Sequence, residues 1–137
     1  MSFWTGKKAV VTGGAGFLGS YVVEELKSKG CKSVFIPRSK DYDLTDERNI
    51  KAMYENAEPD IVIHLAAAVG GIGANERYPG TFFYRNAVMG IQLMELARQY
   101  GVEKFVTIGT TCSYPKHAAI PFKEEDLWNG YPAEVTA

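Results

Sequence analysis

The chain has 137 residues and a net charge of −1 at pH 7; 46% of its residues are hydrophobic and 23% are charged. These values are typical of one folded globular domain and exclude a disordered chain, a collagen-like chain and a general nucleic-acid binder with a basic surface. Two cysteines, Cys31 and Cys112, are too few for a disulfide framework and favour a reducing cytoplasm. No apolar run approaches the roughly 20 residues of a membrane span, and residues 1–14 lack the apolar segment of a signal peptide. We therefore expect a cytoplasmic protein without a nucleic-acid or membrane partner.

Hydrophobic runs and turn residues alternate along the chain in the order strand, helix, strand. The predicted strands are Ala9–Thr12, Ser33–Ile36, Ile61–Leu65 and Phe105–Ile108, and the predicted helices are Phe17–Lys29, Asp46–Asn56 and Tyr78–Tyr100. Thr45 is the expected N-cap of the second helix, and residues 109–137, with three prolines, are expected to be loop. This alternation predicts an α/β fold in a single domain over residues 1–137, with a Rossmann-like, doubly wound parallel sheet that is truncated after about four strands.

A glycine-rich turn follows the first strand and opens the first helix. Its sequence, TGGAGFLG, places Gly13, Gly16 and Gly19 at a G-x-x-G-x-x-G spacing. Glycine lets the backbone approach a pyrophosphate, and the N–H groups that begin the helix face that anion. The turn could instead be tight only for packing, but its place in a strand–helix–strand unit favours dinucleotide binding. The candidate cofactor-binding residues here are Gly13, Gly14, Ala15, Gly16, Phe17, Leu18 and Gly19.

The end of the second strand indicates which dinucleotide is bound. An NAD site usually has Asp or Glu there to bind the ribose 2′-OH, whereas this chain has Arg38, Ser39 and Lys40. A guanidinium, a hydroxyl and an ammonium can each bind the additional phosphate of NADP, although basic residues are also common in solvated loops. We predict NADP, with Asp43 and Leu44 placed under the adenine.

Further motifs extend the pattern over nearly the whole chain. They are His64-Leu65-Ala66-Ala67, Val69-Gly70-Gly71-Ile72-Gly73-Ala74-Asn75, Tyr78-Pro79, Phe82-Phe83-Tyr84-Arg85-Asn86 and Gly109-Thr110-Thr111-Cys112-Ser113-Tyr114-Pro115-Lys116. With the glycine turn, these motifs make the chain resemble the extended short-chain dehydrogenase/reductases. Within them it resembles the GDP-L-fucose synthase family. The Gly-Gly-Ile and Cys-x-Tyr-Pro-Lys segments carry the narrower resemblance.

The resemblance implies an NADPH-dependent epimerase-reductase that acts on GDP-4-keto-6-deoxymannose. It implies that Thr110 hydrogen-bonds the substrate carbonyl and that Cys112 serves in acid/base chemistry during epimerisation, although a free cysteine is more commonly a small buried apolar residue. It also implies a homodimer whose interface includes the long third helix. Further cofactor contacts are expected at Leu65, Ala66, Ala67, Ile108, Gly109, Thr110 and Thr111.

Three further polar side chains have less decided roles. Asn86 lies in an apolar helical row, where an amide needs a partner, and it could bond the backbone near the site or a neighbouring loop. His64 is expected to be a packed core histidine, and His117 a loop histidine without metal-ligand spacing.

The superfamily's proton donor is a tyrosine in a Tyr-x-x-x-Lys helix. The single match, Tyr100 with Lys104, straddles a helix end and a strand start, so the two side chains would not share a helical face. Tyr131 is followed by Val135 and does not match either. We therefore expect this chain to be the N-terminal, cofactor-binding part of a larger enzyme, and to be inactive alone. The alternatives are another nucleotide-sugar epimerase or dehydratase, and a non-catalytic NADP-binding module.

Overall fold

The computed structural model describes residues 2–132, which group into two compact units. The first comprises the described residues up to 68 together with 83–107; the second comprises 69–82 and the described residues from 108 onward. No helix within residues 2–132 is both long enough and apolar enough to cross a membrane.

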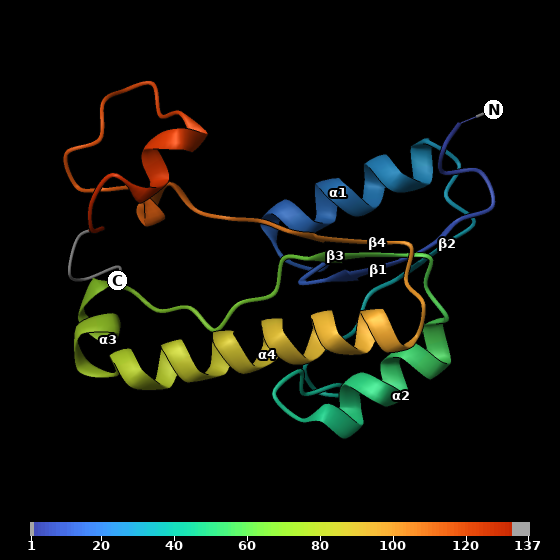
Figure 1. Cartoon of the computed structure of the whole chain (residues 1–137). Helices are drawn as coiled ribbons and strands as arrows, with labels where there is room; N and C mark the ends of the chain where they lie inside the picture. The colour runs from blue at the N-terminus through green and yellow to red at the C-terminus, as the bar shows by residue number, and fades with distance from the viewer. Residues whose placement is uncertain (1, 133–137) are drawn as a thin grey trace. The chain divides into compact units, whose positions relative to one another are not determined.

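A four-stranded parallel sheet forms the centre of the first unit (Figure 1). Its strands are β1 (Lys8–Thr12), β2 (Ser33–Phe35), β3 (Ile61–His64) and β4 (Lys104–Thr107), in the spatial order β2-β1-β3-β4. The register places Val10 opposite both Phe35 and Val62, and Val62 opposite Phe105. The chain therefore reverses its direction of growth after β2, which makes the sheet doubly wound and places the carboxyl ends of all four strands at one edge.

Alternate residues of β1 supply two cores, one on each face of the sheet. Ala9 and Val11 pack with Val23 and Leu26 of α1 (Phe17–Ser28). On the other face, Val10 joins a larger buried cluster from α2 (Glu47–Ala57) and α4 (Pro79–Gln99). Its members are Val10, Leu44, Ile50, Met53, Tyr54, Val62, Met89, Leu93, Leu96 and Ala97. Figure 1 shows α1 on one face and α2 and α4 on the other, so the predicted α/β class is confirmed.

The cap of α2 differs from the prediction. Asp46, not Thr45, is the N-cap, because its carboxylate accepts the backbone N–H of Arg48 at 2.9 Å. The prediction for Thr45 was wrong because the Asp43 carboxylate holds both its N–H, at 2.9 Å, and its hydroxyl, at 2.7 Å. The polar residues before α2 thus form two successive side-chain turns.

The second unit contains a helix that was not predicted, α3 (Ile72–Arg77). Gly70 lies against this helix and the start of α4: a Cβ there would come within 2.8 Å of Ala74 and 2.9 Å of Phe82. The segment predicted to be loop includes two short 3₁₀ helices, Thr111–Ser113 and Glu124–Trp128, and there the rings of Tyr114 and Phe122 stack at 4.7 Å. The last part of the predicted loop, residues 133–137, lies outside the described residues.

Candidate functional site

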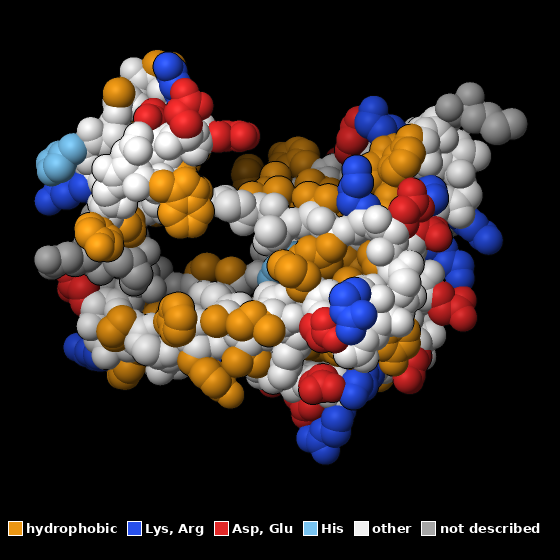
Figure 2. All heavy atoms as spheres, in the orientation of Figure 1, with side chains coloured by type: hydrophobic (Ala, Val, Ile, Leu, Met, Phe, Trp, Pro, Cys, Tyr) orange, Lys and Arg blue, Asp and Glu red, His pale blue; other side chains and the backbone are white. Residues whose placement is uncertain are grey.

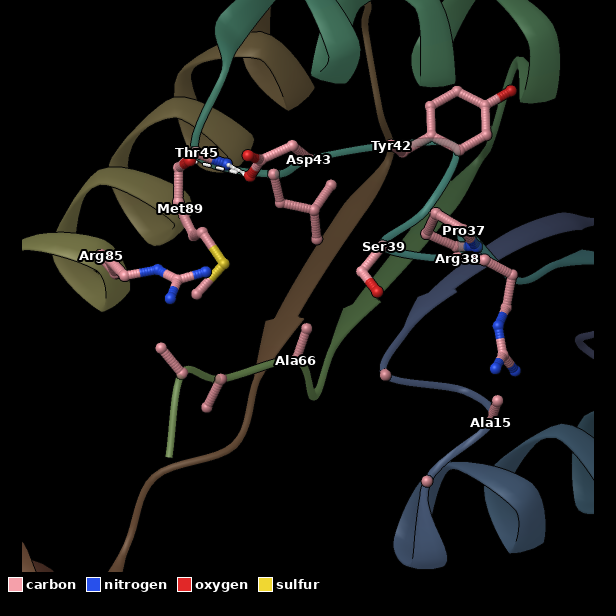
Figure 3. Close-up of a pocket in the computed structure, with 15 residues that line it drawn as sticks. Ala15, Pro37, Arg38, Ser39, Tyr42, Asp43, Thr45, Ala66, Arg85 and Met89 are labelled. Atoms are coloured by element: carbon pink, nitrogen blue, oxygen red, sulfur yellow. Dashed lines mark hydrogen bonds between the residues drawn. The ribbon is translucent and has the colours of Figure 1, made fainter. Parts of the chain in front are cut away.

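A cavity of about 430 Å³ lies in the first unit and is lined at the carboxyl ends of the strands (Figure 3). Its walls come from the glycine turn, the segment after β2, the segment after β3 and one side of α4. The lining residues are Gly13, Ala15, Gly16, Pro37, Arg38, Ser39, Tyr42, Asp43, Leu44, Thr45, Ala66, Ala67, Ala68, Arg85 and Met89. This edge is where doubly wound sheets bind their ligands.

The glycine turn is tight for steric reasons that the structure makes explicit. Gly13 has a φ of +70°, and a Cβ there would lie 2.9 Å from the backbone N of Ala66. A Cβ on Gly19 would lie 2.1 Å from the carbonyl oxygen of Gly13, because α1 begins directly against the turn. Glycine is required at Gly13 for the cavity wall and at Gly19 for the contact between helix and turn.

The first turn of α1 presents unsatisfied donors. Gly16 is the N-cap and offers no side-chain cap, and the N–H groups of Phe17, Leu18 and Gly19 donate to no acceptor within residues 2–132. These donors lie at the positive end of the helix dipole beside Ala15 and Gly16. The arrangement suits a diphosphate that reaches the backbone without a side chain in between.

Two of the three polar residues predicted to bind the additional phosphate line the cavity. Arg38 and Ser39 do, while Lys40 does not. Figure 3 shows the Arg38 side chain running toward Ala15 on the glycine turn. The guanidinium has no ion-pair partner within residues 2–132, so it is available to an anionic ligand.

The segment after β2 also holds a carboxylate in place. The N–H and hydroxyl of Thr45 both donate to Oδ1 of Asp43, and these bonds, with a smaller contribution from the nearby Arg85, lower the pKa of Asp43. Asp43 is therefore ionised and oriented at neutral pH. Leu44 next to it is buried and faces the same cavity.

A hydroxyl at the end of β1 fixes the start of the segment after β3. Oγ1 of Thr12, which is fully buried, accepts the N–H groups of Leu65 and Ala66, each at 3.2 Å, and lies 2.7 Å from Nδ1 of His64. The N–H of Leu65 also reaches the carbonyl oxygen of Thr12 at 3.1 Å, so that bond is shared, and the hydroxyl can donate to Nδ1 of a neutral His64 ring. Burial lowers the pKa of His64, in agreement with this neutral form. The expectation of a packed histidine at position 64 fits these contacts.

Asn86 holds the other end of that segment. Its Oδ1 accepts the N–H of Ala68 at 2.7 Å, and its Nδ2 donates to the carbonyl of the same residue at 2.9 Å. Of the two roles considered for this amide, the structure selects the bond to the backbone beside the cavity, since Ala68 is one of the lining residues.

The candidate catalytic residues lie in the second unit. Thr110 caps the short 3₁₀ helix, and its Oγ1 accepts the N–H of Cys112 at 3.2 Å. Both residues are exposed, so Cys112 is not the small buried residue of the alternative interpretation. Ile108, Gly109 and Thr111 are also in this unit, and all three are exposed.

Within the first unit the structure sorts the predicted cofactor residues into two groups. Those that line the cavity are Gly13, Ala15, Gly16, Arg38, Ser39, Asp43, Leu44, Ala66 and Ala67; those that do not are Gly14, Phe17, Leu18, Gly19, Lys40 and Leu65. Gly14 has a packing role instead, because a Cβ there would meet the carbonyl oxygen of Val11 at 2.9 Å. Six lining residues were not among the predicted cofactor contacts: Pro37, Tyr42, Thr45, Ala68, Arg85 and Met89. No local pattern in the sequence signalled Arg85, because adjacent residues of a helix point in different directions.

A comparison with protein families covers most of the chain. The model of the NAD dependent epimerase/dehydratase family matches residues 9–135. The chain belongs to this family. The predicted resemblance to nucleotide-sugar enzymes of the short-chain dehydrogenase/reductase type is confirmed at that level.

Relatives within the NAD dependent epimerase/dehydratase family include two curated enzymes that carry GDP-sugar names. GDP-L-fucose synthase of Sinorhizobium fredii is 39% identical over 131 residues, which cover 96% of this chain and 41% of that protein. GDP-L-colitose synthase of Yersinia pseudotuberculosis is 32% identical over 123 residues, which cover 90% of this chain and 40% of that protein. The chain therefore spans about two fifths of the length of these relatives.

Among solved structures of such enzymes, a GDP-L-fucose synthetase from Naegleria fowleri bound to NADP is similar in fold as well as sequence. It is 30% identical with a TM-score of 0.84, and the match covers 98% of this chain and 40% of that one. The Rossmann-like sheet is thus shared with a member of the family whose structure contains a dinucleotide.

Proposed function

We propose that this chain is the NADP(H)-binding portion of a GDP-4-keto-6-deoxymannose 3,5-epimerase-4-reductase. The observation that carries the proposal is that the glycine turn and Arg38 line one cavity, with Arg38 running toward Ala15. The uncapped N–H groups of α1 would hold the diphosphate, and Arg38 with Ser39 would hold the 2′-phosphate. NADPH supplies a hydride to a carbonyl carbon when it is bound.

The residues of this chain fit that cofactor chemically. Gly13 lies so close to the backbone of Ala66 that a Cβ has no room there, and no carboxylate takes the position after β2 that favours NAD. Asp43, further along the segment, has its Oδ1 held by Thr45. The NADP-bound relative supports the same assignment.

Thr110 and Cys112 are proposed to act on the sugar. The Thr110 oxygen accepts the Cys112 N–H, so its own hydrogen points away from that bond and can donate to a substrate carbonyl. A cysteine thiol can act as a general acid or base at a carbon beside a keto group. A serine or threonine hydroxyl alone would also serve a related epimerase or dehydratase; Cys112 favours the epimerase-reductase.

The sugar of the proposed substrate has a second candidate. The colitose synthase relative, at 32% identity, favours a second candidate within the same class: a reductase or epimerase of another GDP-linked keto-deoxy sugar. Comparing GDP-4-keto-6-deoxymannose with its 3-deoxy analogue as substrates of the longer protein that contains this segment would separate the two.

Calorimetric titration of the 137-residue chain with NADP and NAD tests the cofactor assignment. We expect binding of NADP at least about tenfold tighter than binding of NAD, because only NADP offers the phosphate to Arg38. Absence of binding by either dinucleotide would refute the proposal.

We also propose that this chain does not turn over substrate alone. Tyr100 follows the end of α4 and donates its hydroxyl to Glu55, whereas Lys104 begins β4, so this Tyr-x-x-x-Lys match is not a catalytic pair. NADPH oxidation by the 137-residue chain with GDP-4-keto-6-deoxymannose, followed at 340 nm, would contradict this expectation.

A further inference from the structure

Two of the five arginines in the sequence line the same cavity. Arg48 and Arg98 form ion pairs with neighbouring carboxylates. Arg38 and Arg85 line the cavity, and within residues 2–132 neither guanidinium has a hydrogen bond or an ion pair. The phosphate assignment uses Arg38 alone, which leaves the second guanidinium without a role.

Arg85 occupies a different part of the cavity from Arg38. It reaches in from α4 beside Met89, whereas Arg38 follows β2 and runs toward the glycine turn (Figure 3). Asp43 is the carboxylate that Arg85 influences electrostatically. That negative charge makes the Arg85 position a poor site for a phosphate.

Asp43 offers one free acceptor atom beside this guanidinium. Both hydrogen bonds from Thr45 go to Oδ1, and Oδ2 accepts nothing within residues 2–132. Leu44 and Met89, only 8% and 7% exposed, give this part of the cavity apolar walls. The wall therefore combines one acceptor and one planar donor with a surface on which a flat base can pack.

Adenine presents the complementary pair of groups. Its amino group donates, and the adjacent ring nitrogen N1, the most basic nitrogen of the ring, accepts. We propose that Arg85 donates to N1 of the adenine while Oδ2 of Asp43 accepts from the amino group, so that Arg85 is a specificity-determining residue for the base. This inference rests on the proposed function, because it requires the dinucleotide to enter the cavity.

Hypoxanthine provides the test, because it carries O6 in place of the amino group and a hydrogen on N1. Nicotinamide hypoxanthine dinucleotide phosphate keeps both phosphate groups that the proposed function uses and loses both base contacts. We expect the 137-residue chain to bind it about tenfold more weakly than NADP. Equal affinities would overturn the inference while leaving the NADP assignment intact.

Substitutions at Arg85 then assign the base contact to this residue. Arg85→Met is expected to weaken NADP binding by about five- to tenfold and to change binding of the hypoxanthine analogue by at most about twofold. Arg85→Lys should recover only part of the loss, because an ammonium lacks the planar donor geometry. Arg98→Met, thirteen residues further along α4 and outside the cavity, is the matched control and should leave both affinities unchanged.

Three results with the Arg85→Met variant would also overturn the inference. Equal weakening of NADP and the analogue by Arg85→Met would show that the residue does not read the base. Loss of the preference for NADP over NAD would make Arg85 a phosphate ligand. Unchanged affinity for NADP in Arg85→Met would show that Arg85 does not contact the dinucleotide. Failure of the unsubstituted chain to bind any dinucleotide would refute the proposed function, and is recognised before any variant is made.

Discussion

Arg38 is the residue on which the choice between NADP and NAD depends. Arg38→Met removes the cationic group that runs from the segment after β2 toward the glycine turn. We expect the variant to lose about tenfold or more in affinity for NADP and to bind NAD as before, because the diphosphate contacts come from the backbone. Calorimetry with both dinucleotides checks this, and Arg77→Met, outside the cavity, serves as the control. A parallel loss for NAD would mean that Arg38 shapes the pocket and does not bind the phosphate.

Asn86 is predicted to matter for stability through a single backbone residue. Asn86→Leu leaves the N–H and the carbonyl of Ala68 without their partners, so the free energy of unfolding should fall by about 2 kcal/mol. Asn86→Asp keeps the acceptor for the N–H and loses the donor to the carbonyl. Urea denaturation measures both variants. Asn56→Leu, which removes one exposed bond to Tyr42, should cost less than about 1 kcal/mol.

His64 should make the stability of the chain depend on pH. Burial lowers its pKa in the folded chain below the value of about 6.5 that it has when unfolded. Below pH 6.5 the unfolded chain then binds more protons, so stability is lost as the pH falls from about 6.5 toward the folded pKa. His64→Gln should lack this loss, and the exposed His117→Gln should keep it in full. Urea unfolding midpoints of both variants, measured between pH 5 and pH 8, test this prediction. Identical dependence of the midpoint on pH in the two variants would contradict it.

The role of a residue could be predicted where it follows from neighbouring residues in the sequence, and could not where it depends on tertiary packing. Gly13 and Gly19 stand in a contiguous motif whose steric needs follow from the strand–helix turn itself. The bond of Asn86 was recognised as one of two possibilities, because a buried amide must find a partner. Arg85 was missed, since its place in the cavity depends on how α4 crosses the sheet, which no local pattern encodes. The N-cap at Asp46 was missed because Thr45 and Asp46 are adjacent, and both residue types commonly cap helices.

Between elements, α1 packs closely against the glycine turn at Gly19. Gly19→Ala would place a Cβ 2.1 Å from the carbonyl oxygen of Gly13, so helix and turn must separate. We expect a loss of more than about 3 kcal/mol in unfolding free energy, or failure to fold. Gly73→Ala, in α3 with no atom within 4 Å, should change stability by less than about 1 kcal/mol. Thermal unfolding of the two variants compares them, and similar midpoints would disprove the close contact.

The elements themselves were largely predictable because their hydrophobic patterns are strong. Buried parallel strands such as β1 appear as apolar runs ended by glycine, and α4 has proline at its start and glycine after its end. The helix α3 was missed because residues 69–74 contain three glycines, which lower intrinsic helix propensity. It forms where Gly70 allows Ala74 and Phe82 to approach, which is a tertiary cause.

At the scale of the whole molecule, α4 carries an apolar surface that the sheet does not cover. Phe83, Tyr84, Ile91 and Met94 are between 54% and 76% exposed, and Figure 2 shows hydrophobic side chains along this helix. We propose that two copies of the chain associate through this surface. Light scattering at micromolar concentration should give a dimer, and Ile91→Glu should give a monomer. Tyr21→Glu, an exposed apolar position on α1, should leave the dimer intact. A monomeric unsubstituted chain would contradict the proposal.

The cavity is assembled from four stretches that are distant in sequence: residues 13–16, 37–45, 66–68 and 85–89. A dinucleotide that touches all four acts as a reversible cross-link, so local opening of any one stretch requires the ligand to leave first. Saturating NADP should therefore slow deuterium uptake in the four stretches together. Slowing confined to residues 13–16 would mean that the ligand rests on the glycine turn alone.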